Sequence, residues 1–250
     1  MIKFFRKIRQ KLLTENRFNK YILYAIGEIT LVMIGILLAL QVNNWNEKRI
    51  AKTNEVKTLQ QLNIDLKTNL KELKSISSYV IYSKSGMSNI LEGLNNGFES
   101  IDSLRVWVEQ SNGGNIFNNA NTAYKNIENN DKSIISNDSL RIRITLMYER
   151  HFFNVKSRER ISAELFKPRY KTELLRSFKV GKRTKTTENA SIWAVNTPID
   201  INLLRKNVLY KNALVELLNF NILRIRRLKD TIKELELLIQ DIDSEIKRLI

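Results

Sequence analysis

The sequence predicts a mainly α-helical protein, in which one N-terminal transmembrane helix is followed by a helical bundle with long, coiled-coil-like first and last helices. The 250 residues include only eight glycines and two prolines, so turns are few and helices are long. An apolar run lies near the N-terminus, and leucine and isoleucine recur at seven-residue spacing in two later stretches. We expect a basic segment at 1–20, a transmembrane helix at 21–43 and a helical domain at 44–250.

The apolar run from Tyr21 to Val42 is long enough to cross a membrane. At about 1.5 Å per residue, a helix of this length spans roughly 33 Å, and the hydrocarbon core of a bilayer is about 30 Å thick. Trp45 follows the run and is expected to anchor its exit at the membrane interface. No small-x-small cleavage site follows, so we expect an uncleaved signal anchor. The alternative is a buried core helix of a soluble domain.

The charges on either side of the apolar run indicate its orientation. Residues 1–20 contain seven lysines and arginines and one glutamate, whereas residues 43–60 contain four basic residues and two glutamates. Because the cytoplasmic flank of a membrane helix carries the excess of basic residues, we expect the N-terminus in the cytoplasm and residues 44–250 on the other side.

The N-terminal part of the chain resembles a known family. Residues 4–47 contain a basic stretch, the sequence YAIGEI at the start of the membrane helix and the sequence QVNNWNE at its exit. This arrangement is similar to the N-terminus of a family of uncharacterised bacterial single-pass membrane proteins, and residues 122–150 resemble the soluble part of that family more loosely. The resemblance implies placement in a bacterial inner membrane, and it implies no activity.

One face of the membrane helix is expected to contact another helix. Glu28 lies about 10 Å into the span by helical rise, and Tyr24, Gly35 and Ala39 share its face. Gly35 and Ala39 form a small-x-x-x-small pair, which allows two helices to approach closely. The partner would be a second copy of the chain or another membrane protein. In the alternative interpretation, Glu28 is protonated or reaches the lipid headgroups, and the face has no partner.

Beyond the membrane, a long helix is expected at about 46–83, with an apolar seam that faces other helices. Its seam residues are Leu59, Leu66, Leu73 and Val80. We expect breaks at the glycines Gly86, Gly93 and Gly97. A second helix is expected from Ser100 to Gln110, with Ser100 as its N-cap.

The middle of the domain is expected to contain shorter elements. A short helix is expected at 122–129, and a longer one at 139–165 that Asn137 or Asp138 caps and that ends before Pro168. The apolar stripe of the longer helix is Leu140, Ile144, Met147, Phe152, Val155 and Ile161. The stretch 180–189 is polar and basic and indicates a loop, while 190–197 is expected to be a short strand or an extended segment.

Residues 199–250 predict the last long helix, with Asp200 as its cap. Two series of apolar residues, each spaced by seven, form its coiled-coil seam. One series is Ile225, Ile232, Ile239 and Ile246, and the other is Leu228, Leu235, Ile242 and Leu249. The seam pairs either with a second copy in a parallel coiled coil or with the 46–83 helix, antiparallel, inside one bundle.

The residue types exclude several kinds of chemistry. Cysteine is absent and histidine occurs once, so disulfides, thiolate metal sites and multi-histidine metal sites are excluded. His151 lies beside two phenylalanines and is expected to be a packed or surface residue and not a general base. We therefore expect no enzyme activity and no cofactor.

The basic balance, 42 lysines and arginines against 26 acids, is expected to reflect a solvated helical surface. It is accompanied by no nucleic-acid-binding motif, so nucleic acid is not an expected partner. The expected partners are the lipid bilayer and either a second copy or another membrane protein.

Together these features predict a single-pass inner-membrane protein with a non-catalytic periplasmic domain for interaction or scaffolding. A ligand-sensing periplasmic domain that acts through a partner membrane protein is the alternative, and an envelope enzyme is a third possibility.

Overall fold

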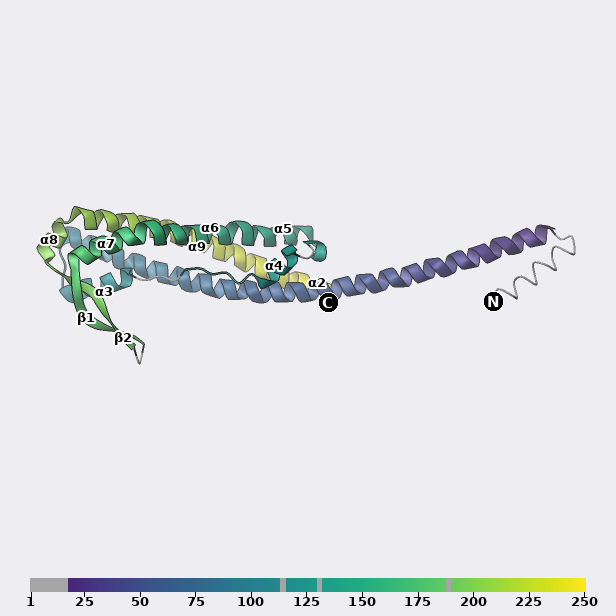
Figure 1. The fold of residues 1–250 in the computed structure, drawn as a ribbon, viewed down its shortest axis with the longest axis horizontal. Coiled ribbons are helices and arrows are strands. Elements are labelled where there is room, and N and C mark those ends of the chain that lie inside the picture. Colours follow the sequence, from purple (N-terminus) through teal and green to yellow (C-terminus); the bar gives the residue numbers. More distant parts are fainter. Residues whose placement is uncertain (1–17, 113–115, 130–131, 188–189) are drawn as a thin grey trace. The chain divides into compact units, whose positions relative to one another are not determined.

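The computed structural model describes residues 18–112, 116–129, 132–187 and 190–250, and it confirms the helical fold class (Figure 1). The described chain consists of helices and one two-stranded sheet. It divides into two compact units, residues 1–55 and residues 56–250. Most of the basic segment 1–20 and the side chain of Tyr24 lie outside the described residues.

Helix α2 (Phe18–Asn96) is a single helix of 79 residues. The expected breaks at Gly86 and Gly93 are wrong, and the helix ends only at Gly97, whose φ of +102° is a conformation that glycine adopts readily. A Cβ atom on Gly86 would lie 2.7 Å from the backbone oxygen of Trp107, and one on Gly93 would lie 2.2 Å from the ring of Phe98. These two glycines therefore allow close packing and do not end the helix.

Helix α3 (Ile101–Ser111) and helix α4 (Thr122–Asn129) begin and end close to the residues that the sequence predicts. The Ser100 side chain caps α3 by accepting a 3.0 Å hydrogen bond from the Ser103 amide. Polar side chains of α2 hold the backbone at the start of α4 and just before it. Asn69 both donates to and accepts from the backbone of Ala120, and Asp65 accepts from the Ala123 amide. These contacts explain why a polar residue interrupts the apolar seam of α2 at Asn69.

Beyond the short 3₁₀ turn η1 (Lys132–Ile134), one continuous helical run contains α5 (Asp138–Leu146), η2 (Met147–Phe152), α6 (Phe153–Ile161), η3 (Ser162–Phe166) and α7 (Lys167–Ser177). Asn137 caps α5, as predicted.

The expected end before Pro168 is wrong. The π turn η3, in which the Lys167 amide donates to the oxygen of Ser162, precedes Pro168 and widens the helix where a proline would otherwise disrupt it. Ile161 is 36% exposed instead of joining the apolar stripe, because six residues of helix place it about 120° around the axis from the buried Val155.

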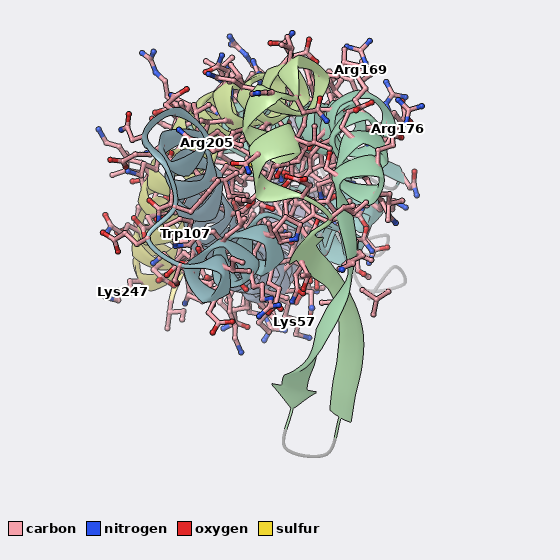
Figure 2. All side chains as sticks on the ribbon, turned by 90° about the vertical axis from the view of Figure 1, so that its left-hand side faces the viewer. Lys57, Trp107, Arg169, Arg176, Arg205 and Lys247 are labelled. Carbon is pink, nitrogen blue, oxygen red and sulfur yellow. The ribbon has the colours of Figure 1, made fainter. Side chains whose placement is uncertain are left out.

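Strands β1 (Phe178–Thr187) and β2 (Ala190–Pro198) form an antiparallel hairpin. The strand predicted at 190–197 is present, whereas the loop expected at 180–189 is largely β1. The hairpin extends away from the helices (Figures 1 and 2), so it needs no continuous apolar face. The alternation that identifies a strand in a sequence is therefore weak in this region.

The expected last helix is divided at Asn207 into α8 (Ile201–Lys206) and α9 (Val208–Leu249). Asp200 caps α8, and the Asn207 side chain caps α9 by accepting from the Tyr210 amide at 3.0 Å. Helix α9 runs antiparallel to α2 inside the larger unit, since Lys74 pairs with Glu236 at 2.6 Å and Lys67 with Asp243 at 3.5 Å.

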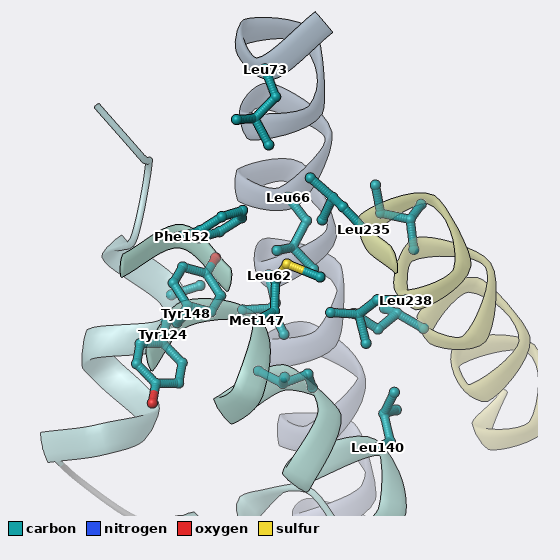
Figure 3. Packing of buried hydrophobic residues seen from close by; sticks show 14 of the residues in the cluster. Leu62, Leu66, Leu73, Tyr124, Leu140, Met147, Tyr148, Phe152, Leu235 and Leu238 are labelled. Carbon is teal, nitrogen blue, oxygen red and sulfur yellow. The ribbon is translucent and has the colours of Figure 1, made fainter. Parts of the chain in front are cut away.

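The interior of the larger unit contains two apolar clusters. The first joins leucines of α2 and α9 to Tyr124, Met147, Tyr148 and Phe152 (Figure 3). The rings of Tyr124 and Tyr148 stack with their centroids 4.3 Å apart. The second cluster lies near Gly97 and contains residues of α2, α3, α7, α8 and α9.

We expect Gly86→Ala to destabilise the larger unit by about 1–3 kcal/mol, because the new methyl group must displace the backbone of α3. Alanine has the higher helix propensity, so packing and propensity predict opposite signs. Thermal unfolding of the full-length protein in mild detergent, followed by circular dichroism, measures the change. Ser85→Ala, at an exposed neighbouring position, is the control and should be neutral or slightly stabilising. A stabilised Gly86→Ala variant would contradict the close approach.

Candidate functional site

One helix near the N-terminus is long and apolar enough to span a membrane. In its most apolar window the mean hydropathy is 2.1 and no residue is buried within the described structure. Leu23, Leu31 and Leu38 are 77%, 69% and 61% exposed. Exposed apolar surface on this scale is unfavourable in water and marks a surface that a membrane or a protein covers. Trp45, which follows the apolar run, is 68% exposed.

The predicted membrane contact face lies on this part of α2. Glu28 is half-buried, whereas Gly35 and Ala39 are open at the helix surface. A Cβ atom on Gly35 would meet no described atom within 4 Å, so the space beside it is available to another helix. The hydroxyl of Thr30 donates to the Ile26 carbonyl at 2.9 Å, which satisfies this polar group within the helix.

The predicted C-terminal seam packs inside the larger unit. Its buried members are Leu228, Leu235, Ile239, Ile242 and Leu249. Its partly buried members, at the edge of the first cluster, are Ile225, Ile232 and Ile246. The seam thus packs against helices of its own chain in this structure, which corresponds to the intramolecular alternative.

The buried stripe of α9 differs by one residue from the predicted seam. In addition to the series that contains Leu228, a second series spaced by seven residues is buried. Its members are Arg224, Thr231, Leu238 and Glu245. Three of these four residues are polar. The spacing of apolar residues therefore predicted that the neighbouring isoleucines, starting at Ile225, form the seam in their place. The helix is rotated toward polar groups that the sequence analysis did not identify.

The most prominent of these groups is a buried ion pair between α9 and α6. Arg224 Nη2 lies 2.7 Å and 2.6 Å from the two carboxylate oxygens of Glu159, and Nε lies 3.2 Å from Oε1. The Nη1 group donates to Asn221 Oδ1 at 2.9 Å. The side chains of Arg224 and Glu159 are only 4% and 2% exposed. Such a bidentate arrangement supplies both directional hydrogen bonds and charge compensation.

The ion pair lies between the two apolar clusters. On α9, the second cluster ends at Leu218 and the buried members of the first begin at Leu228. On α2, the buried members of the first cluster end at Val80 and those of the second begin at Met87. We call the residues at this level, Ser83, Ser111, Glu159, Asn221 and Arg224, the polar layer. It separates one apolar interior from the other.

Hydroxyl groups extend the polar layer toward the second cluster. Ser111 Oγ lies 2.7 Å from the Tyr170 hydroxyl, which lies 3.4 Å from the Tyr210 hydroxyl. Burial raises the pKa of both tyrosines, so both are neutral at pH 7. Burial, followed by repulsion from Arg224, lowers the pKa of Lys167 beside the layer. The layer therefore contains two hydrogen-bonded groups. Arg224 joins Glu159 of α6 to Asn221 of α9, and Ser111 of α3 joins Ser83 of α2 to Tyr170 of α7.

A small cavity adjoins the polar layer and is lined in part by Tyr79, Ser83, Lys167, Asn221 and Arg224. Its volume is about 10 Å³, room for roughly one water molecule. A larger groove of about 240 Å³ lies along α4 and α5, with Ile127, Ile135 and Ile144 among its apolar lining residues. Typical small-molecule sites begin at about 300 Å³.

His151 lies on the π turn η2 and is half-buried. Burial is the main cause of a pKa below the usual value of histidine, so His151 is neutral at pH 7. Among the residues that the structure describes, no group of three or more histidines, aspartates and glutamates could hold a metal ion.

The sequence contained two signals for the polar layer. Asn221 lies seven residues before Leu228 and so continues its series. Arg224 lies one helical turn before Leu228. Glu159 likewise lies one turn after the buried Val155. A charged residue of each sign in phase with an apolar stripe indicates a buried pair, but the sequence does not show which charges meet.

Comparison with known proteins assigns a large part of the chain to a family. The model of a family of unknown function (DUF6090) matches residues 28–170, more than half of the chain. The matched region begins in the apolar part of α2 and ends in α7. No curated protein and no solved structure matches the chain.

We expect Arg224→Met to destabilise the protein by about 3–5 kcal/mol, because it leaves Glu159 buried without a cation. The double variant Arg224→Met/Glu159→Met removes both charges and should recover most of this loss. Thermal unfolding of both variants in mild detergent measures the difference. A double variant that is less stable than Arg224→Met would show that the two charges do not depend on one another.

Proposed function

The chain belongs to DUF6090, a family of unknown function, and from this premise and the structure we propose that it is a single-pass membrane-anchored protein. Its helical domain would act as a non-catalytic interaction or scaffold domain. The observation that carries the proposal is the exposed apolar part of α2, whose length and composition suit a membrane.

The proposed location is the bacterial inner membrane, with residues 1–20 in the cytoplasm and the domain in the periplasm. The support is the difference between a strongly basic flank before the span and a less basic one after it. A signal anchor of this type remains attached to the domain, so the domain would act at the membrane surface.

The buried, paired charges of the larger unit support a scaffold role. The polar layer fixes helices against one another, and the buried charges of Glu159 and Arg224 neutralise each other. Such groups specify one arrangement of helices, as a rigid interaction domain requires.

The second candidate is ligand sensing through a partner membrane protein, and the groove along α4 and α5 favours it. A bound molecule in this groove of the purified protein, identified by mass spectrometry, would favour sensing over scaffolding.

The topology predicts that a reporter active only in the periplasm is active when fused after Ile250 and inactive when fused before Met1. The measurement is reporter activity in cells, normalised to the amount of each fusion protein. A control with Ile34→Arg and Leu38→Arg places two charges in the span at about 2.5–3.5 kcal/mol each, and should release the protein from membranes. An inactive C-terminal fusion together with an active N-terminal fusion would overturn the proposed location.

The contact face predicts that Gly35→Leu weakens association of the full-length protein, because the larger side chain keeps helices apart. Sedimentation in mild detergent gives the mass of the complex, and co-purification identifies other membrane proteins. Ile36→Leu, a conservative change on the neighbouring face, is the control. An unchanged mass and an unchanged set of co-purified proteins for Gly35→Leu would exclude the contact.

A further inference from the structure

An exposed apolar surface lies at one end of the helical domain. It consists of six aliphatic side chains, each more than half exposed, from α7, β1, α8, α9 and the residue before the Asp200 cap. These are Leu175, Val180, Ile199, Leu203, Val208 and Leu209. We call them the tip surface.

Backbone and side-chain contacts around Ser177 bring these elements together. The Ile199 amide donates to the Ser177 carbonyl at 3.0 Å, and the Asn207 side chain donates to the Ser177 hydroxyl at 3.0 Å. Leu175 lies two residues before Ser177, and Val208 directly follows Asn207. The elements that carry the exposed residues therefore meet at this end of the domain although they are distant in the sequence.

The tip surface lies at the far end of the larger unit from the point where α2 enters it. Arg205 donates to the backbone oxygen of Asn95, near the end of α2. From Val56 to Asn96, the helical rise gives about 60 Å. A partner that binds at this end of the larger unit is therefore about 60 Å from the end at which α2 enters.

Basic residues accompany the tip surface. The described residues 169–181 and 199–211 contain seven lysines and arginines against two acids. Glu173 pairs with Arg176 at 2.8 Å and Asp200 caps α8. Arg169 pairs with Glu216 of α9 at 3.3 Å, so two of the seven basic residues have an acidic neighbour in the structure. Figure 2 looks onto this end and shows Arg169, Arg176 and Arg205 around its edge. An apolar centre with a basic edge complements a surface that is negatively charged and has an apolar interior.

We propose that the tip surface binds an anionic lipid surface. The aliphatic side chains enter the boundary between headgroups and acyl chains, and the surrounding lysines and arginines contact the anionic headgroups. Clusters of four to eight basic residues are typical of such binding, and each contributes to affinity near anionic lipid. The inference rests on the proposed interaction role and specifies its partner.

The residue types favour lipid over a folded acidic protein. The centres of protein interfaces are enriched in aromatic residues and methionine, whereas the tip surface contains leucine, isoleucine and valine alone. An aliphatic centre needs no shaped pocket in its partner, and a bilayer offers none. A protein partner is therefore the outcome that the experiment must distinguish.

The experiment uses the full-length protein reconstituted in liposomes of neutral phosphatidylcholine. Fluorescent vesicles with 30% phosphatidylglycerol are added, and their capture by the proteoliposomes is measured after flotation. We expect capture that falls with rising salt and that is absent for vesicles of phosphatidylcholine alone. Retention of the protein in its own liposomes reports anchoring separately, so failure of the tip surface and failure of the anchor are distinguishable.

Two pairs of variants locate the binding surface. Arg205→Glu/Lys206→Glu should lower capture at least about tenfold, and Val208→Ser/Leu209→Ser should lower it as well. The matched controls on α9 are Arg226→Glu/Arg227→Glu and Ile222→Ser/Leu223→Ser. They make the same change of charge, or replace two exposed aliphatic side chains by serine, away from the tip. They should leave capture unchanged.

Capture of neutral and anionic vesicles to the same extent would overturn the proposal, as would tip variants that behave like their controls. A protein that stays anchored but captures no anionic vesicles would also overturn it, and would leave a protein partner as the occupant of the tip surface. Circular dichroism of each variant establishes that it remains folded.

Discussion

The arrangement of the helical domain depends on the buried ion pair between Arg224 and Glu159. Each charge alone would be strongly unfavourable in an apolar interior, and the pair is tolerated because the guanidinium meets both carboxylate oxygens. Moving α9 by one turn would separate the two groups and leave both charges buried without a partner. The pair therefore selects one register of α9 against α6, which the apolar clusters above and below could not do alone.

The same principle applies on the other side of α2. Asp65 and Asn69 are buried, and their side chains hold the backbone around Ala120 and Ala123, which has no helical partner there. Buried backbone amides and carbonyls need hydrogen bonds, so α2 provides them at the cost of two apolar positions. Polar residues in the seams of α2 and α9 thus determine which segments pack where, while leucines supply most of the apolar area.

Local signals in the sequence predicted the structure well, and signals that depend on distant residues did not. Ser100 and Asn137 cap helices as predicted, because a cap requires only its own first turn. Gly86 and Pro168 were expected to end helices, yet the first allows α3 to approach and the second follows a π turn. The polar layer escaped prediction because Arg224 and Glu159 are 65 residues apart and only the fold brings them together.

The family match and the core together indicate how large the folding unit is. The matched residues, 28–170, include Leu62, Leu66 and Glu159 but not α9. In this chain Leu62 and Leu66 belong to one cluster with Leu235 and Leu238 (Figure 3), and the carboxylate of Glu159 pairs with Arg224 of α9. Without α9 the matched segment would expose the apolar residues that α9 covers, and Glu159 would lose the guanidinium that pairs with it. The matched segment is therefore an incomplete domain by itself, and α9 completes both its apolar core and its charge balance.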